Sequence, residues 1–166
     1  MTLAERAPAG TDRLARAVFA LLVVACFAAF FVTQRLKHTP TAVQAFKLTP
    51  FFSPTPAGHI KQERISFKIA HSDDVTVTIV DAAGRDVATL VRHLPVAGYK
   101  PLSLRWNGRL GVARRYTVVG AASRHPSLLA VNRGRLAPAG DYRVRVSLRR
   151  RDRAILSPRS FTLVRK

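Results

Sequence analysis

An unbroken apolar run near the N-terminus is the feature that most constrains this chain. Residues 17–34 carry no charge, and their apolar side chains cover every face of a helix, with Arg16 before them and Arg35 and Lys37 after them. A helix of this length spans roughly 27 Å, close to the ~30 Å hydrocarbon core of a bilayer. Basic residues at both ends can reach the lipid headgroups. We therefore expect a short tail over 1–16 and a transmembrane helix over 17–34.

Three fates of this segment are open: a retained anchor, a cleaved secretory signal and a lipoprotein signal. Residues 23–26 resemble the motif whose cysteine, here Cys26, becomes lipid-modified after cleavage. The apolar run nevertheless continues past that cysteine, and no small-residue cleavage site follows it, so we favour a retained anchor. Basic residues balance across the segment and do not fix its orientation. We expect a plasma-membrane protein with a cytoplasmic N-terminus and an extracytoplasmic remainder.

The hydrophobic pattern changes after the membrane segment. Residues 35–58 are rich in proline and predict a stalk, in which 45–48 and 51–52 are apolar enough to form a first strand. From residue 59 apolar and polar residues alternate, which is typical of strands with one face in a core. The alternating apolar residues are Ile65, Phe67, Ile69; Val75, Val77, Ile79; Leu102, Leu104, Trp106; Tyr142, Val144, Val146, Leu148; and Phe161, Leu163. We expect an all-β fold over 59–166, an Ig-like or fibronectin-III-like antiparallel β-sandwich without an intrachain disulfide, because Cys26 is the only cysteine.

Several motifs in this region resemble the FlgD-type Ig-like domain family, named for the Ig-like module of the flagellar hook-capping protein. They are Phe52-Ser-Pro54, the stretch 75–90 with Asp81 and Gly84, the Trp106-Asn-Gly108 turn, and 134–144 with Gly140 and Tyr142. Together they cover most of residues 50–164 in the family's order. The resemblance implies structural roles for these residues, with tight turns at the glycines and Trp106 between the sheets. It also implies a non-catalytic module appended to surface or assembly proteins.

An insertion of roughly twenty residues departs from the family pattern, at about 109–133. A loop of this length in a compact domain is usually functional or disordered. Its apolar residues and its Arg114, Arg115, Tyr116 and Arg124 differ from a passive linker, which would be polar and rich in Gly and Ser. We expect this insertion to carry the binding specificity. A second candidate is a basic stripe formed by Arg143, Arg145, Arg149, Arg151 and Arg153.

The search for chemistry predicts no enzyme and no cofactor. The five histidines share no metal-ligand spacing, and no nucleophile or phosphate-binding motif occurs. The loop 55–59 lacks the carboxylates that a calcium site would need. A net charge of +19 favours anionic partners. We predict a membrane-anchored module for interaction or assembly at the cell envelope, with an envelope protein or an anionic polymer as partner. Nucleic acid is less favoured, because aromatic residues are missing beside the arginines.

Overall fold

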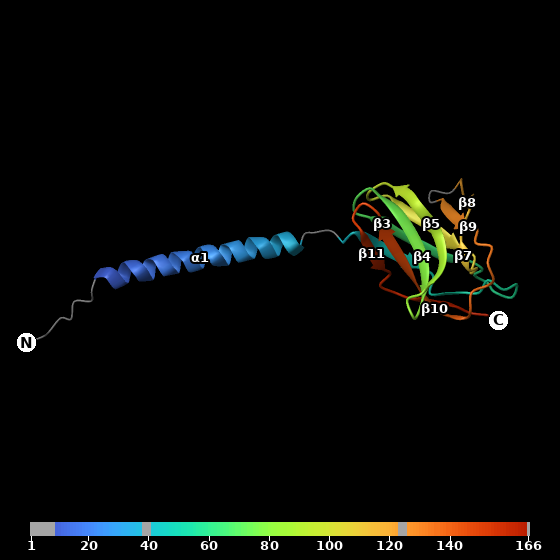
Figure 1. The fold of residues 1–166 in the computed structure, drawn as a ribbon, viewed down its shortest axis with the longest axis horizontal. Coiled ribbons are helices and arrows are strands. Elements are labelled where there is room, and N and C mark those ends of the chain that lie inside the picture. Colours follow the sequence, from blue (N-terminus) through green and yellow to red (C-terminus); the bar gives the residue numbers. More distant parts are fainter. Residues whose placement is uncertain (1–8, 38–40, 123–125, 166) are drawn as a thin grey trace, which may run out of the picture. The chain divides into compact units, whose positions relative to one another are not determined.

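The computed structural model describes residues 9–37, 41–122 and 126–165, and it divides the chain into two units at Pro40 and Thr41. The first unit is the helix α1, Ala9–Lys37 (Figure 1). Within it, Leu14–Gln34 is long and apolar enough to cross a membrane, and none of these residues is buried. The helix extends beyond the predicted 17–34 because its flanks are rich in Ala, Leu and Arg, which favour helix. The predicted tail over 1–16 is therefore helical from Ala9, while residues 1–8 lie outside the described ones.

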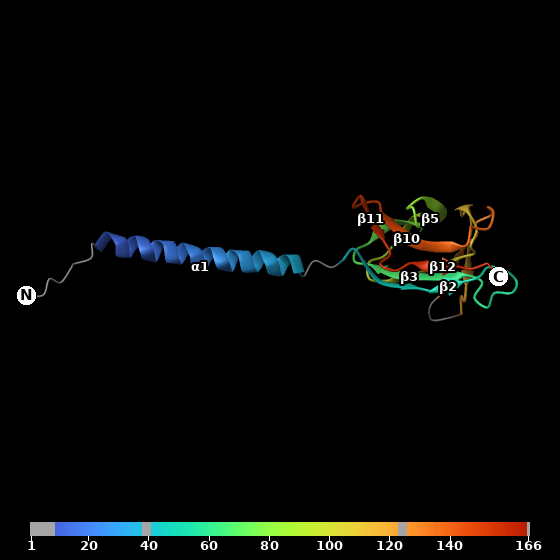
Figure 2. The same ribbon diagram turned by 90° about the horizontal axis from the view of Figure 1, so that it is seen from below.

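The second unit is a β-sandwich, which confirms the predicted fold of a sandwich preceded by one helix. Figure 2 shows β10 and β11 in one layer and β3 in the other. The first sheet has the order β1 (Val43–Leu48), β3 (Glu63–Ile69), β6 (Pro101–Trp106), β9 (Ser127–Ala130), β8 (Tyr116–Val119). The second has the order β2 (Phe51–Phe52), β12 (Phe161–Leu163), β10 (Gly140–Leu148), β4 (Asp73–Asp81), β5 (Asp86–Val96), β7 (Gly111–Val112), and β11 (Arg153–Leu156) also pairs with β10.

Both sheets are mixed, whereas the sequence predicted only antiparallel pairing. The long strands pair antiparallel, but β2 with β12, β5 with β7 and β6 with β9 are parallel. Each parallel pair includes a strand of four residues or fewer. β2, β7 and β9 come from segments that the alternating pattern does not mark, so the direction of these pairs could not be predicted.

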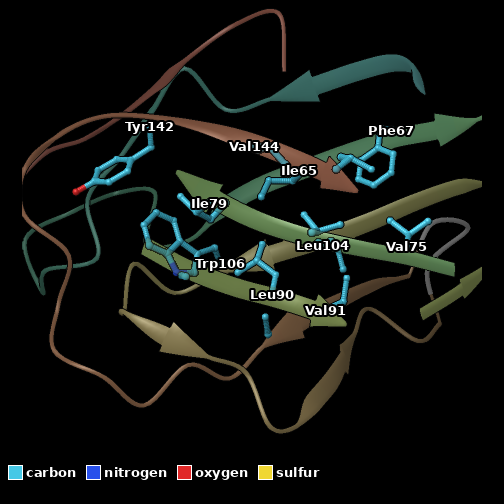
Figure 3. Packing of buried hydrophobic residues seen from close by; sticks show 14 of the residues in the cluster. Ile65, Phe67, Val75, Ile79, Leu90, Val91, Leu104, Trp106, Tyr142 and Val144 are labelled. Carbon is cyan, nitrogen blue, oxygen red and sulfur yellow. The ribbon is translucent and has the colours of Figure 1, made fainter. Parts of the chain in front are cut away.

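The core lies between the sheets and is built from the alternating residues. On β3 the buried apolar side chains are Ile65, Phe67 and Ile69, while those between them are exposed or half-buried. Trp106 is fully buried, and Figure 3 shows it among Ile79 and Leu90 from the facing strands. The predicted central position of Trp106 is thereby confirmed.

The predicted stalk is corrected, because most of it belongs to the sandwich. β1 pairs antiparallel with β3, and β2 pairs with β12 at the edge of the other sheet. Phe52 is buried against Trp106, with ring centroids 5.6 Å apart. The prolines of 50–58 do not form an extended spacer, because the Ser53 N–H donates to the carbonyl of Ile60 at 2.8 Å and closes the segment as a loop. The β unit therefore starts at Thr41 rather than at residue 59.

Candidate functional site

Asp81 and Gly84 form the turn between β4 and β5, as the resemblance implied. The Gly84 N–H donates to the Asp81 carbonyl at 2.9 Å, and Gly84 has φ +78°, which glycine adopts without strain. The Asp81 carboxylate accepts from the backbone N–H of Arg85 at 2.9 Å and pairs with its guanidinium. These contacts lower the pKa of Asp81, and the hydrogen bond from the Arg85 backbone N–H has the largest effect. Both residues thus shape a turn and leave no group free for chemistry.

Trp106 and Gly108 close the end of β6. The indole Nε1–H donates to the Arg109 carbonyl at 2.9 Å, so this buried polar group is satisfied. Gly108 has φ +75°, and a Cβ at this position would lie 2.9 Å from Pro54 Cγ. A side chain at Gly108 would therefore displace the Pro54 segment. The positive φ and this close contact both explain why glycine occupies the position.

Tyr142 lies at the start of β10, two residues after Gly140, whose φ is +153°. Its hydroxyl donates to the carbonyl of Pro138, four residues earlier, at 2.6 Å. Burial, together with the charge of Asp81, raises the pKa of the phenol, so it stays protonated and donates. A tyrosine that bonds back to the backbone before its strand is a tyrosine corner, a feature of Ig-like sandwiches. Tyr142 is a structural residue.

The segment 109–133 was predicted to be a long loop. In the structure it instead contributes three strands, β7, β8 and β9. Ala113 and Ala130 are buried, and Asn132 is 1% exposed. The Asn132 Nδ2 donates to the carbonyls of Gly111 at 2.6 Å and Thr89 at 3.2 Å, which fastens the segment to β5. Ala113, Ala130 and Asn132 therefore belong to the core, and only the exposed residues of the segment can bind a partner.

The exposed part of this segment includes three of the four predicted binding residues. Arg114 and Arg115 are exposed just before the edge strand β8, and Tyr116, its first residue, and Val118, 54% exposed, lie on that strand. Arg124 lies outside the described residues. The structure thus brings the two arginines and Tyr116 together on one hairpin edge, where Arg114 lines a small pocket with Leu110 and Val131.

The predicted basic stripe is divided between three places. Arg143 and Arg145 lie on the outer face of β10, where Arg145 contacts Asp86 at 2.5 Å and the Gly84 carbonyl at 2.8 Å. Arg149 and Arg151 lie in the exposed turn between β10 and β11. Arg153 pairs with buried Leu148, so it lies on the inner face of the sheet, at its edge. The five arginines therefore do not form one surface.

Asp73 holds the basic turn in place from the neighbouring strand. Its Oδ1 accepts from the backbone N–H of Arg150 at 2.9 Å and from that of Asp74 at 2.7 Å. Asp73 and Asp74 are the first two residues of β4. By accepting these two hydrogen bonds, the buried carboxylate satisfies backbone N–H groups at the start of β4 and in the neighbouring turn.

Most carboxylates of the β unit are engaged inside it. Glu63 and Asp73 are buried, while Asp81 and Asp86 pair with arginines. Burial raises the pKa of Glu63 to about 8, so this group is largely uncharged at neutral pH. Because Lys and Arg outnumber Asp and Glu by 28 to 9 in the chain, most exposed basic residues have no acidic counterpart and the surface of this unit is cationic.

A groove of about 800 Å³ lies between β1 and β11, the edge strands of the two sheets. It is lined by 41–48 and by Arg153, Ile155, Leu156, Pro158 and Arg159. Sequence reasoning missed this groove because its two walls are more than a hundred residues apart. A signal was present in the apolar residues 45–48, which needed partners, but nothing in the sequence pairs them with β11.

Within 9–37, 41–122 and 126–165, no three His, Cys, Asp or Glu side chains are grouped so that they could hold a metal ion. The geometry thus offers a basic surface and a groove, both suited to binding. A scan against protein-family models gives no match for this chain, and a search of curated proteins gives none either.

Proposed function

We propose that this protein is a non-enzymatic, membrane-anchored interaction module of the cell envelope, with α1 as its anchor and the β-sandwich as its binding part. The observation that carries the proposal is the span Leu14–Gln34 of α1, which is strongly apolar and contains no buried residue. Such a surface is unstable in water and is covered by lipid when the helix crosses a bilayer. A cytoplasmic N-terminus and an extracytoplasmic sandwich at the plasma membrane are part of the proposal.

Three local arrangements support an Ig-like module of the FlgD type. They are the Asp81–Gly84 turn, the buried Trp106 and the hydrogen bond from Tyr142 to Pro138. Asp81, Gly84 and Trp106 have the turn and core positions that the resemblance implies, and Tyr142 adds a hydrogen bond typical of Ig-like sandwiches. Because these roles shape the fold and use none of the groups in catalysis, they fit a scaffold for binding.

Fractionation tests the anchor. The full-length chain should remain in the membrane pellet after alkaline carbonate treatment and dissolve only in detergent. Protease added to sealed right-side-out vesicles should digest the sandwich. Release by carbonate would overturn the anchor, and full protection of the sandwich would reverse the orientation. An N-terminus at a lipid-modified Cys26 would replace the helical anchor with a lipid one.

A second candidate function is the binding of an anionic polymer through the surface arginines. The observation that favours it is the turn with Arg149 and Arg151, whose side chains are exposed while Asp73 fixes the backbone. Binding of a polyphosphate chain should then weaken linearly on a log–log plot against salt, by about one unit of slope for each phosphate contact. Arg149→Glu with Arg151→Glu should lower that slope. A slope near zero would exclude this candidate.

A further inference from the structure

The groove between β1 and β11 has two free strand edges along its sides. β1 is the last strand of its sheet, and β11 pairs only with β10 among the described residues. Edge strands carry backbone N–H and C=O groups that can pair with another chain. The edge of β1 is irregular, with a bulge between Gln44 and Lys47 and φ +52° at Ala45. The edge of β11 is regular, so it is the better template for an added strand.

The pairing of β11 shows which of its backbone groups face the groove. The Ser157 N–H donates to the Val144 carbonyl at 2.7 Å, and the register then pairs Ile155 with Val146. In an antiparallel pair, alternate residues direct their N–H and C=O toward the partner and away from it. Ala154 and Leu156 therefore direct theirs to the free edge. A partner strand could bond to both without disturbing β10.

The side chains of the groove combine apolar surface with positive charge. Phe46, Leu48 and Ile155 are half-buried there, and Leu156 is 47% exposed. The three charged lining residues are Lys47, Arg153 and Arg159, and no carboxylate lines the groove. Arg153 and Ile155 share the inner face of β11, because their partners Leu148 and Val146 are both buried. The groove thus presents apolar and cationic groups side by side along one strand.

We propose that this groove binds an extended, acidic segment of a partner protein, which adds as a strand to the free edge of β11. The partner's backbone bonds to Ala154 and Leu156. Because side chains alternate along a strand, its carboxylates enter the groove and meet Lys47, Arg153 and Arg159, while its apolar residues lie on the outer face beside Leu156. Strand addition of this kind takes affinity from main-chain hydrogen bonds and specificity from alternate side chains. This inference rests on the proposed interaction function and names its partner class.

The test uses the full-length chain in a neutral detergent and a fluorescent octapeptide in which glutamate and valine alternate. We expect the wild-type chain to bind it, and Lys47→Glu/Arg153→Glu/Arg159→Glu to weaken binding by about tenfold or more. The control variant Arg92→Glu/Lys100→Glu/Arg135→Glu changes the net charge equally at exposed residues outside the groove. It should weaken binding by less than about threefold, the part due to long-range attraction. Equal losses in both variants would overturn the groove in favour of bulk charge.

Two further measurements test the strand geometry. Ala154→Pro removes an outward N–H at an edge, where proline is tolerated, and should weaken binding while the thermal midpoint changes little. Of two octapeptides, one N-methylated at its valines and one at its glutamates, only one should lose affinity, because alternate amides face β11. Equal effects of the two methylations, or full binding by Ala154→Pro, would overturn strand addition.

Competitors separate the peptide from other anions. Polyglutamate of the same charge, a polyphosphate chain and vesicles rich in anionic lipid should each compete poorly, because none supplies alternating apolar residues. Strong competition by any of them, or no binding of the octapeptide by the wild-type chain up to about 1 mM, would overturn the proposal. The proposed anchor is tested separately, since carbonate extraction does not depend on the groove.

Discussion

The ring of Tyr142 meets the indole of Trp106 edge to face, with centroids 5.7 Å apart and the planes at 72°. This pair comes from β10 and β6, which belong to different sheets, so it joins the two halves of the core. Trp106→Ala should lower the free energy of unfolding by about 3–5 kcal/mol. Urea unfolding of the detergent-solubilised chain measures this. Tyr99→Ala, at a residue that is 60% exposed, is the control and should change little. Equal midpoints for both variants would contradict the placement of Trp106.

Tyr142→Phe isolates the hydrogen bond to Pro138. The ring stays in the core, but the Pro138 carbonyl loses its donor. We expect a loss of about 0.5–1.5 kcal/mol in unfolding free energy, the usual value for one such bond. A variant as stable as the wild type would show that water replaces the hydroxyl at this corner.

Glu63 should make stability depend on pH. It is fully buried, its Oε1 accepts from the Thr49 N–H at 2.8 Å, and its Oε2 has no hydrogen-bond partner among the described residues. Burial raises its pKa from the ordinary 4.5 to about 8, so the folded chain holds this proton more tightly than the unfolded chain does. Stability should therefore fall as the pH rises from about 4.5 to about 8 and then level off.

Glu63→Gln removes this titration and keeps an oxygen for the Thr49 N–H. We expect the variant to be more stable than the wild type at pH 8 and to lose the slope between pH 5 and pH 8, since one pKa unit corresponds to about 1.4 kcal/mol. Urea unfolding at several pH values measures both. Parallel pH profiles for the two proteins would show that Glu63 is solvated.

Within 109–133, the residues that stabilise the fold should differ from those that bind a partner. Asn132→Ala leaves the carbonyls of Thr89 and Gly111 without this donor and should cost about 1–3 kcal/mol. Arg114→Ala, Arg115→Ala and Tyr116→Ser, at exposed residues, should each cost less than about 0.5 kcal/mol. Replacing 110–133 with a short Gly/Ser turn should unfold the domain, because Ala113, Ala130 and Asn132 are buried. A folded deletion variant would place the whole segment outside the core.

Asp73→Ala should loosen the basic turn. It removes the acceptor for the backbone N–H groups of Asp74 and Arg150, and Ala cannot replace it. We expect a loss of about 1–3 kcal/mol and faster amide hydrogen exchange at Arg150. Asp152→Asn, at an exposed residue of the same turn whose φ of +46° asparagine tolerates, is the control. Unchanged exchange at Arg150 would show that the turn is held by other contacts.

The sequence predicted the helix, the sandwich and its central tryptophan because each depends on a periodic pattern or a local motif. Alternation marks β3, β4, β6 and β10 directly, and Trp106 falls on the inner face of β6 by that count. The roles of Asp81 and Gly84 follow from the geometry of one turn. These features require no knowledge of which strands are neighbours.

The remaining features depend on contacts between distant segments. The pairing of β1 with β3 drew the predicted stalk into the fold, and Asn132 became a core residue only through carbonyls on β5 and β7. The basic stripe was predicted by counting arginines along one hairpin, but pairing to β10 turned Arg153 to the inner face. The groove shares this cause, since one wall is near each end of the β unit.

Because β2 pairs with β12, the order in which the chain is synthesised limits when the β unit can fold. β12, Phe161–Leu163, comes more than a hundred residues after β2, yet it pairs with β2 and buries Phe161 and Leu163 in the core. While β12 is still inside the ribosome, Phe52 has no strand beside it and the sandwich stays open. The β unit can therefore close only after β12 has left the ribosomal tunnel, and a nonsense mutation between β11 and β12 would leave a chain with most of its strands but without a closed core.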